Sequence, residues 1–169
     1  PSRLIPGGHL DLLVASPECT HHSVARGGRP CSDQSRASAY HVTHWLSTLD
    51  VSELLLENVV EFENWGPLLR RSIRYGKKTI KAGRPDPRKR GAIFQSFVGM
   101  IASLGYPMIE WRVMNSADYG AATTRKRLFL RASRSRRPIS WPEPTHEQTA
   151  HGHTPKWRHA REIIDWNIK

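Results

Sequence analysis

Short apolar runs alternate with helical periodicity over most of the chain. The apolar runs predict four strands, at residues 10–15, 54–56, 108–113 and 128–132. Apolar residues at helical spacing predict one helix around Val42–Leu49 and a second over Gly91–Leu104, with Gly105 as its stop. Strands that alternate with helices indicate an α/β fold, with a mostly parallel sheet flanked by helices.

The segments between these elements differ in composition. Residues Glu18–Ser32 hold glycine, proline and polar residues, and this composition predicts a long, mobile loop. Ten of the twenty-one residues of Arg70–Arg90 are Lys or Arg, which predicts a solvated loop or a phosphate contact. Ser133–Thr154 is rich in Arg, Pro and His, as a linker is, and Thr154-Pro155 is typical of the start of a helix that runs through Ile164.

The chain begins with proline instead of methionine and ends inside that last predicted helix. We therefore expect a fragment of a longer protein. Residues 1–135 would form one partial domain. Residues 136–169 would form a linker and a helix that lead to a region outside the chain.

Charge narrows the class of partner. The chain has 26 Lys and Arg against 15 Asp and Glu, a formal net charge of +11. Such a balance favours a polyanion, usually nucleic acid and less often an anionic membrane surface. The sequence has no run of 18 apolar residues and no signal-peptide pattern, and two cysteines are too few for a disulfide scaffold. We expect a cytoplasmic protein without a membrane partner.

Two reactive side chains follow the first two predicted strands. Cys19 comes four residues after the first strand, and Glu57 comes at the end of the second. Because ligands of α/β sheets bind at the carboxyl ends of the strands, both residues would lie on the same rim. A thiol and a carboxyl group there can act as nucleophile and acid. Position alone favours the alternative, an unreactive loop thiol and an ordinary strand-end carboxylate.

The order of the motifs favours the catalytic interpretation. The motifs are Ser16–Cys19 (SPEC), Asp33–Arg36 (DQSR), Glu57–Val59 (ENV), Asp118–Gly120 (DYG) and Arg125–Arg127 (RKR). In order and spacing they resemble the central motifs of the C5-cytosine DNA methyltransferases. The residues around these motifs are most similar to the branch found in phages and prophages. This resemblance implies the Rossmann-like fold of S-adenosylmethionine-dependent methyltransferases, incomplete in this chain. It also implies that residues 1–135 are a partial catalytic domain, and that residues 136–169 lead to a target-recognition region outside the chain.

The resemblance also implies a role for each matching residue. Cys19 matches the nucleophile that attacks the target base, and Glu57 matches the carboxyl group that acts on the ring nitrogen N3. Asn58 would hold the neighbouring loop in place. Arg125 and Arg127 match two arginines of the family, one of which steadies the base near its O2 carbonyl while the other organises the site.

Cofactor and DNA contacts are implied in the same way. S-adenosylmethionine would bind at the same rim, with contacts from Pro17, Glu18 and Asn58. The partner would be double-stranded DNA, bound by a monomer, and the target base must be flipped out of the duplex. The Glu18–Ser32 loop would close over this base. The residues of the loop expected to contact DNA are Ser23, Arg26 and Arg29.

The sequence departs from the family pattern at several places. Glu18 precedes the cysteine, where the family usually has proline, although the phage-like branch also has an acidic residue there. Thr123 stands where the late arginine motif usually begins with glutamine. The family's glycine-rich cofactor loop and target-recognition region have no match in the chain. We therefore expect the 169 residues alone to be inactive.

Other interpretations account for fewer residues. The spacing of Cys19, His21, His22 and Cys31 matches no common zinc site, so no metal is expected. A basic nucleic-acid-binding module on a relic methyltransferase fold, binding through Arg70–Arg90, is the main alternative to an enzyme. It would not need Cys19, Glu57 and Arg125 together. RNA as substrate is a third possibility that no feature of the sequence excludes.

Overall fold

The computed structural model describes residues 3–19, 36–149 and 153–168. The chain divides into two compact units. The first consists of Pro1–Arg112 and Leu128–Ile139, and the second of Val113–Arg127 and Ser140–Lys169. Since the two units have no determined arrangement, each is described by itself.

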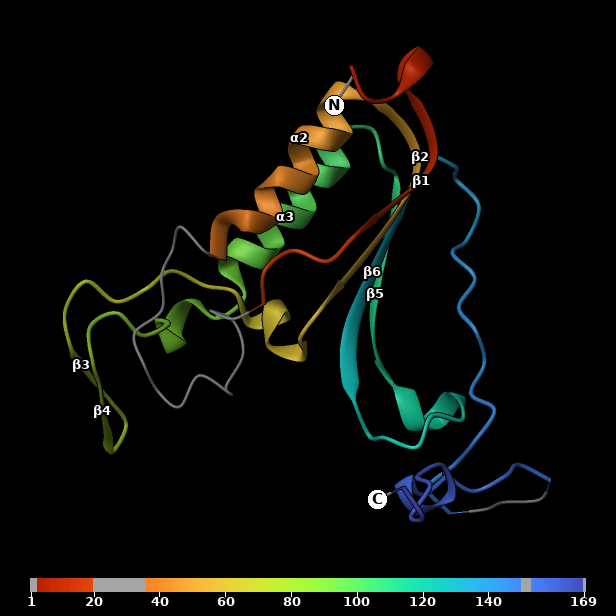
Figure 1. The fold of residues 1–169 in the computed structure, drawn as a ribbon. Coiled ribbons are helices and arrows are strands. Elements are labelled where there is room, and N and C mark those ends of the chain that lie inside the picture. Colours follow the sequence, from red (N-terminus) through yellow and green to blue (C-terminus); the bar gives the residue numbers. More distant parts are fainter. Residues whose placement is uncertain (1–2, 20–35, 150–152, 169) are drawn as a thin grey trace. The chain divides into compact units, whose positions relative to one another are not determined.

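A four-stranded sheet has the order β1-β2-β6-β5. Its strands are β1 (His9–Ala15), β2 (Asp50–Asn58), β5 (Met108–Asn115) and β6 (Lys126–Ser133), labelled in Figure 1. All four contain the apolar runs from which strands were predicted, and the α/β fold class is confirmed. β1 and β2 are parallel, with Ala15 opposite Leu56.

The sheet is mixed, although the alternation of strands and helices indicated a mostly parallel one. β6 runs antiparallel to β2, with Leu128 opposite Asn58 and Ala132 opposite Leu54. A parallel neighbour needs a long crossover, usually a helix. β5 is joined to the adjacent β6 by residues 116–125, which form only the short 3-10 helix Ser116–Tyr119. The sequence pattern of the strands does not show this change of direction.

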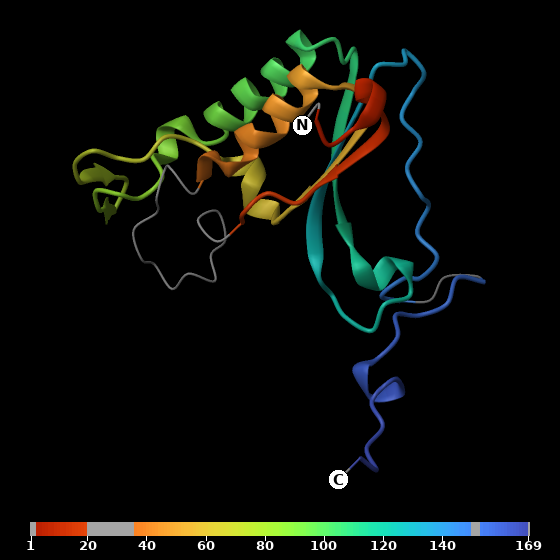
Figure 2. The same ribbon diagram turned by 45° about the horizontal axis from the view of Figure 1, so that its top comes forward.

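Two helices lie side by side and cover one face of the sheet (Figures 1 and 2). They are α2 (Tyr40–Thr48) and α3 (Ala92–Ser103), as the apolar spacing predicts. α3 starts after Gly91 and is followed by Gly105, and both glycines have a positive φ, of 77° and 92°. This left-handed conformation favours glycine, because a Cβ would be strained there.

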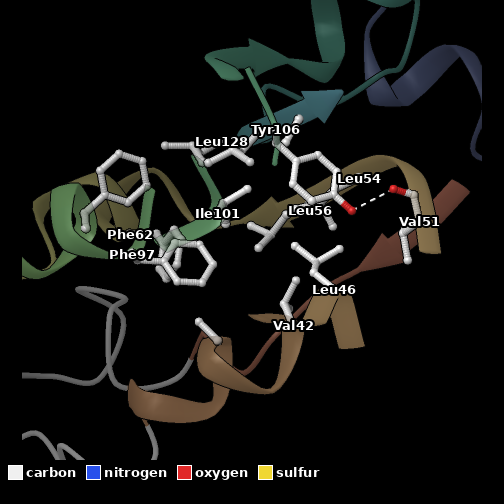
Figure 3. Packing of buried hydrophobic residues seen from close by; sticks show 14 of the residues in the cluster. Val42, Leu46, Val51, Leu54, Leu56, Phe62, Phe97, Ile101, Tyr106 and Leu128 are labelled. Carbon is white, nitrogen blue, oxygen red and sulfur yellow. Dashed lines mark hydrogen bonds between the residues drawn. The ribbon is translucent and has the colours of Figure 1, made fainter. Parts of the chain in front are cut away.

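The hydrophobic core lies between these helices and the sheet (Figure 3). Phe94, Phe97 and Ile101 of α3 are fully buried, as are Leu54 and Leu56 of β2. Burial of each such side chain stabilises the fold by about 1.5–3 kcal/mol. Within this core, the Tyr106 hydroxyl donates a buried hydrogen bond of 2.7 Å to the Val51 carbonyl at the start of β2.

The basic segment Arg70–Arg90 is not simply the solvated loop that its charge predicted. It contains a β-hairpin of β3 (Ile73–Tyr75) and β4 (Lys78–Ile80), in which Tyr75 pairs with Lys78. Gly76 and Lys77 form the two-residue turn, and Gly76 has a φ of 58°. Glycine as the first of two turn residues is typical of a type II′ hairpin.

The prediction of a final helix from Thr154 through Ile164 is wrong. Among residues 153–168 the only helical element is the 3-10 turn Ala160–Glu162. Ile163 and Ile164 are 59% and 45% exposed. A short helix is marginal in water unless its apolar face packs, and these side chains do not pack. In the described parts of the chain, every helix is too short or too polar to cross a membrane.

Candidate functional site

The parallel pairing of β1 and β2 places their carboxyl ends at one edge of the sheet. Ala15 is opposite Leu56, so the segment after β1 and the last residues of β2 leave the sheet together. The segment Ser16–Cys19 follows β1 directly, and the thiol residue Cys19 is half-buried. The structure thus brings the Cys19 segment and Glu57–Asn58 to the same rim.

A hydrogen bond joins these two motifs. The Asn58 side-chain amide donates to the Pro17 carbonyl at 3.1 Å. The side-chain oxygen of Asn58 accepts from the backbone N–H of Val59 at 2.8 Å. Asn58 is only 1% exposed. The Asn58 amide therefore links the end of β2 to Pro17, two positions before Cys19. We call this link the Asn58 clamp.

Glu57 and Asn58 point to opposite faces of the sheet. Leu54, Leu56 and Asn58 are buried at alternate positions of β2, whereas Leu55 and Glu57 between them are half-buried. This alternation follows from the pleat of the strand. Asn58 therefore points to the face of the buried core, and the Glu57 carboxyl group points to the other, more accessible face.

The late motifs lie in the second unit. The Arg125 carbonyl accepts hydrogen bonds from the Ser116 backbone N–H at 3.0 Å and from its hydroxyl at 3.1 Å. Arg125 itself is exposed, and Arg127 is half-buried and donates to the Lys126 carbonyl at 2.8 Å. The residues just before DYG are thus bonded to the RKR motif, although nothing places either motif against Cys19 or Glu57.

Asp118 has contacts that the sequence did not predict. Its carboxylate accepts from the Trp157 indole N–H at 2.9 Å. Its backbone carbonyl accepts from the N–H groups of Thr145 and His146, at 2.8 and 3.0 Å. The DYG motif therefore organises the C-terminal part of the second unit. No sequence signal connects Asp118 with a tryptophan thirty-nine residues later.

Arg36 is the one residue of the DQSR motif that the structure describes. It is 2% exposed, and its guanidinium donates to the Gly66 carbonyl at 2.6 Å. The expected DNA contacts at Ser23, Arg26 and Arg29 lie outside the described residues. A pocket of about 250 Å³ beside Arg36 is also lined by Asn64, Trp65, Asp86 and Arg90, and none of the predicted catalytic residues lines it.

Asp86 carries the strongest electrostatic perturbation near this pocket. Arg88 binds its carboxylate through two hydrogen bonds, of 2.8 and 2.7 Å. This side-chain pairing, assisted by a bond from the Arg88 backbone N–H, lowers the pKa of Asp86 to about 2. The ion pair fixes the chain just before α3. Asp86 was visible in the sequence as the one acid of a basic run, but its pairing was not.

Comparisons with known proteins agree with the two late motifs. The family model of the C-5 cytosine-specific DNA methylases matches residues 86–165, a range that includes DYG and RKR but neither Cys19 nor Glu57. The type II methyltransferase M.Sau3AI of Staphylococcus aureus is 28% identical over 123 residues, which cover 71% of this chain. The chain spans only 25% of that relative's length.

Solved structures show the same fold. The methyltransferase EhMeth of Entamoeba histolytica has a TM-score of 0.51 and 14% identity over 94% of this chain and 40% of its own. A mutant of Spodoptera frugiperda DNMT2 has a TM-score of 0.50 and 17% identity over 95% of this chain and 41% of its own. At these identities the likeness concerns the fold alone. Over residues 86–165, the chain is thus similar in sequence to the C-5 cytosine-specific DNA methylases.

Proposed function

We propose that this chain carries the central catalytic residues of a DNA (cytosine-5)-methyltransferase, with Cys19 as the nucleophile. The observation that carries the proposal is the Asn58 clamp, because its bond to the Pro17 carbonyl ties the Cys19 segment to the strand that holds Glu57. The similarity of residues 86–165 to the C-5 cytosine-specific DNA methylases, and of the chain to M.Sau3AI, supports the choice of this reaction.

The proposed reaction starts with addition of a thiolate to the ring. C5 of cytosine is a poor nucleophile, so the Cys19 sulfur adds to C6 and makes the ring electron-rich. The electron pair moves toward N3, where the Glu57 carboxyl group donates a proton or hydrogen bond. C5 would then take the methyl group, with S-adenosylhomocysteine as the leaving group. Water would accept the C5 proton, N3 would return its proton to Glu57, and the sulfur would leave C6. The C5–C6 double bond and the free Cys19 thiolate are thereby restored.

S-adenosylmethionine would supply the methyl group as an electrophile when bound. Glu18 is exposed directly after β1, at the edge where α/β sheets bind ligands, and so it is available to a cofactor. Pro17 beside it is half-buried. The amide of Asn58 is occupied by Pro17 and Val59, so Asn58 would act on a cofactor by positioning Pro17 and Glu18. These residues fit one side of a cofactor site.

The other assignments rest on the family motifs. Arg125 or Arg127 would hold the flipped base near O2, while the other organises the loop at the start of β6. Ser23, Arg26 and Arg29 would contact the duplex around the extruded base. The enzyme would act as a monomer on double-stranded DNA in the cytoplasm. Since the chain spans a quarter of the curated relative, we propose that the 169 residues alone are inactive.

A covalent trapping experiment tests this function. The full open reading frame would be expressed and mixed with S-adenosylmethionine and duplex DNA of random sequence carrying 5-fluorocytosine. Fluorine at C5 blocks the final loss of the proton, so a working enzyme remains attached to its DNA. We expect a denaturant-stable adduct that is absent from Cys19→Ala.

The second cysteine provides the matched control. Cys31→Ala removes the other thiol of the chain and should leave the adduct intact. Absence of an adduct in the unmodified protein, with DNA binding retained, would contradict the enzyme and favour a binding module. An adduct in Cys19→Ala would show that the nucleophile has been misassigned. Methyl transfer by the 169-residue chain alone would refute its proposed inactivity.

A further inference from the structure

Residues 67–86, which we call the basic hairpin, extend away from the helices and the sheet of the first unit (Figures 1 and 2). The basic hairpin contains β3 and β4 and the Gly76-Lys77 turn at its tip. None of the residues proposed for catalysis or cofactor binding lies in it.

The basic hairpin is held firmly at its base. Backbone bonds of 2.8 Å run from the Leu69 N–H to the Arg84 carbonyl and from the Gly83 N–H to the Leu69 carbonyl. Leu69 itself is buried. Next to the basic hairpin, the Gly66 carbonyl accepts the bond from buried Arg36. The basic hairpin is therefore ordered before it binds a partner, and this order reduces the entropic cost of binding.

Most cations of the basic hairpin have no acidic partner among residues 3–19, 36–149 and 153–168. Six of its cations are exposed and form no ion pair within the parts of the chain that the structure describes: Arg70, Arg71, Arg74, Lys77, Lys78 and Lys81. The only acid of the hairpin is Asp86, which is bound by Arg88. The tip therefore presents cations alone.

The hairpin shows these cations on both of its faces. Arg74 pairs with Thr79 on one face, while Tyr75 pairs with Lys78 on the other. Tyr75 is 49% exposed and lies beside the cations at the tip. Cations interleaved with an exposed aromatic ring suit a chain of phosphates and sugars. An ordered hairpin with unpaired charge gains affinity from the counterions that it releases from DNA.

We propose that the basic hairpin binds the sugar-phosphate backbone of double-stranded DNA. The proposal rests on the proposed function for its choice of partner, because the charge by itself fits any nucleic acid. The hairpin adds affinity without reading sequence, since phosphate contacts carry no base information. It supplements the contacts made around the target base.

The test compares two variants of the full-length protein that lose equal charge. The first is Arg74→Gln/Lys77→Gln/Lys78→Gln at the hairpin tip, where all three side chains are exposed. The matched control is Arg3→Gln/Arg136→Gln/Arg137→Gln, also exposed and outside the hairpin. Affinity for a fluorescent duplex would be measured by anisotropy over a series of NaCl concentrations. Each phosphate contact contributes about 0.9 to the slope of log K against log salt.

We expect the magnitude of the slope of log K against log salt to decrease by about 2–3 in the hairpin variant and by less than about 1 in the control. Affinity of the hairpin variant at low salt should fall at least about tenfold, since each lost contact weakens electrostatic binding. Equal changes in both variants, or none in the hairpin variant, would overturn the proposal. The proposal would also be overturned if the hairpin variant lost affinity only for an RNA duplex of the same sequence. Failure of 5-fluorocytosine trapping with the slope change present would refute the enzymatic function alone.

Discussion

Removal of the Asn58 clamp should uncouple the Cys19 segment from β2. Asn58→Ala leaves the buried Val59 N–H without its acceptor, which costs about 1–3 kcal/mol. It also removes the bond to the partly buried Pro17 carbonyl, worth about 0.5–1.5 kcal/mol. The sum predicts that the free energy of unfolding falls by about 1.5–4.5 kcal/mol, measurable by urea denaturation.

Asn58→Asp separates positioning from stability. The carboxylate keeps an acceptor for the Val59 N–H but offers the Pro17 carbonyl no donor. We expect this variant to lose covalent trapping of 5-fluorocytosine DNA by at least about tenfold, the effect of 1.4 kcal/mol. The loss of trapping should exceed what the lower folded fraction of this variant explains, with that fraction measured by urea denaturation.

Tyr106→Phe is the matched control. It removes one buried hydrogen bond, to Val51, and should cost about 0.5–1.5 kcal/mol. Val51 lies seven residues before Asn58 on β2, about 23 Å away along the strand. This variant should trap DNA normally. If Asn58→Asp traps DNA as well as Tyr106→Phe does, Asn58 does not position the Cys19 segment.

Three further perturbations test other features of the first unit. Gly66→Ala should lower the free energy of unfolding, measured by urea denaturation, by at least about 1–3 kcal/mol. The reason is that an added Cβ would lie 2.2 Å from the Lys89 carbonyl oxygen. A smaller decrease would show that the backbone can shift to accommodate the Cβ. Asp86→Asn should destabilise the chain at neutral pH. The difference in stability from the unmodified chain should shrink as pH falls from about 4 toward 2, because the pKa of Asp86 is lowered to about 2 and its ionised form stabilises above its unfolded value. A difference that stays constant with pH would contradict the ion pair with Arg88. Hydrogen bonds to Asp50 and then to Asp11 raise the pKa of His9 above 6.5, so this pairing stabilises fully below pH 6.5 and is lost as pH rises through the raised value. NMR titration of the His9 ring should show the raised pKa and its return toward 6.5 in Asp50→Asn, and an unchanged value in that variant would exclude the pairing.

Part of the candidate site follows from local sequence. Cys19 and Glu57 could be placed on one rim because each follows an apolar run, and parallel strands of an α/β sheet end at the same edge. The Asn58 bond to Pro17 could not be derived in this way, since it joins residues 41 positions apart. The position of Arg125 and Arg127 was equally beyond local pattern, and their motif lies in a separate unit.

The sequence by itself determined where the two α-helices and the four strands of the larger sheet form, because apolar spacing fixes which side chains can be buried together. Both long helices and all four sheet strands follow from that spacing, and Gly91 and Gly105 bound α3. Tertiary structure alone decided the antiparallel direction of β6, because strand direction depends on a connection and not on side-chain pattern. It also decided that residues 155–164 form no long helix, since periodicity stabilises a helix only where a surface covers its apolar face.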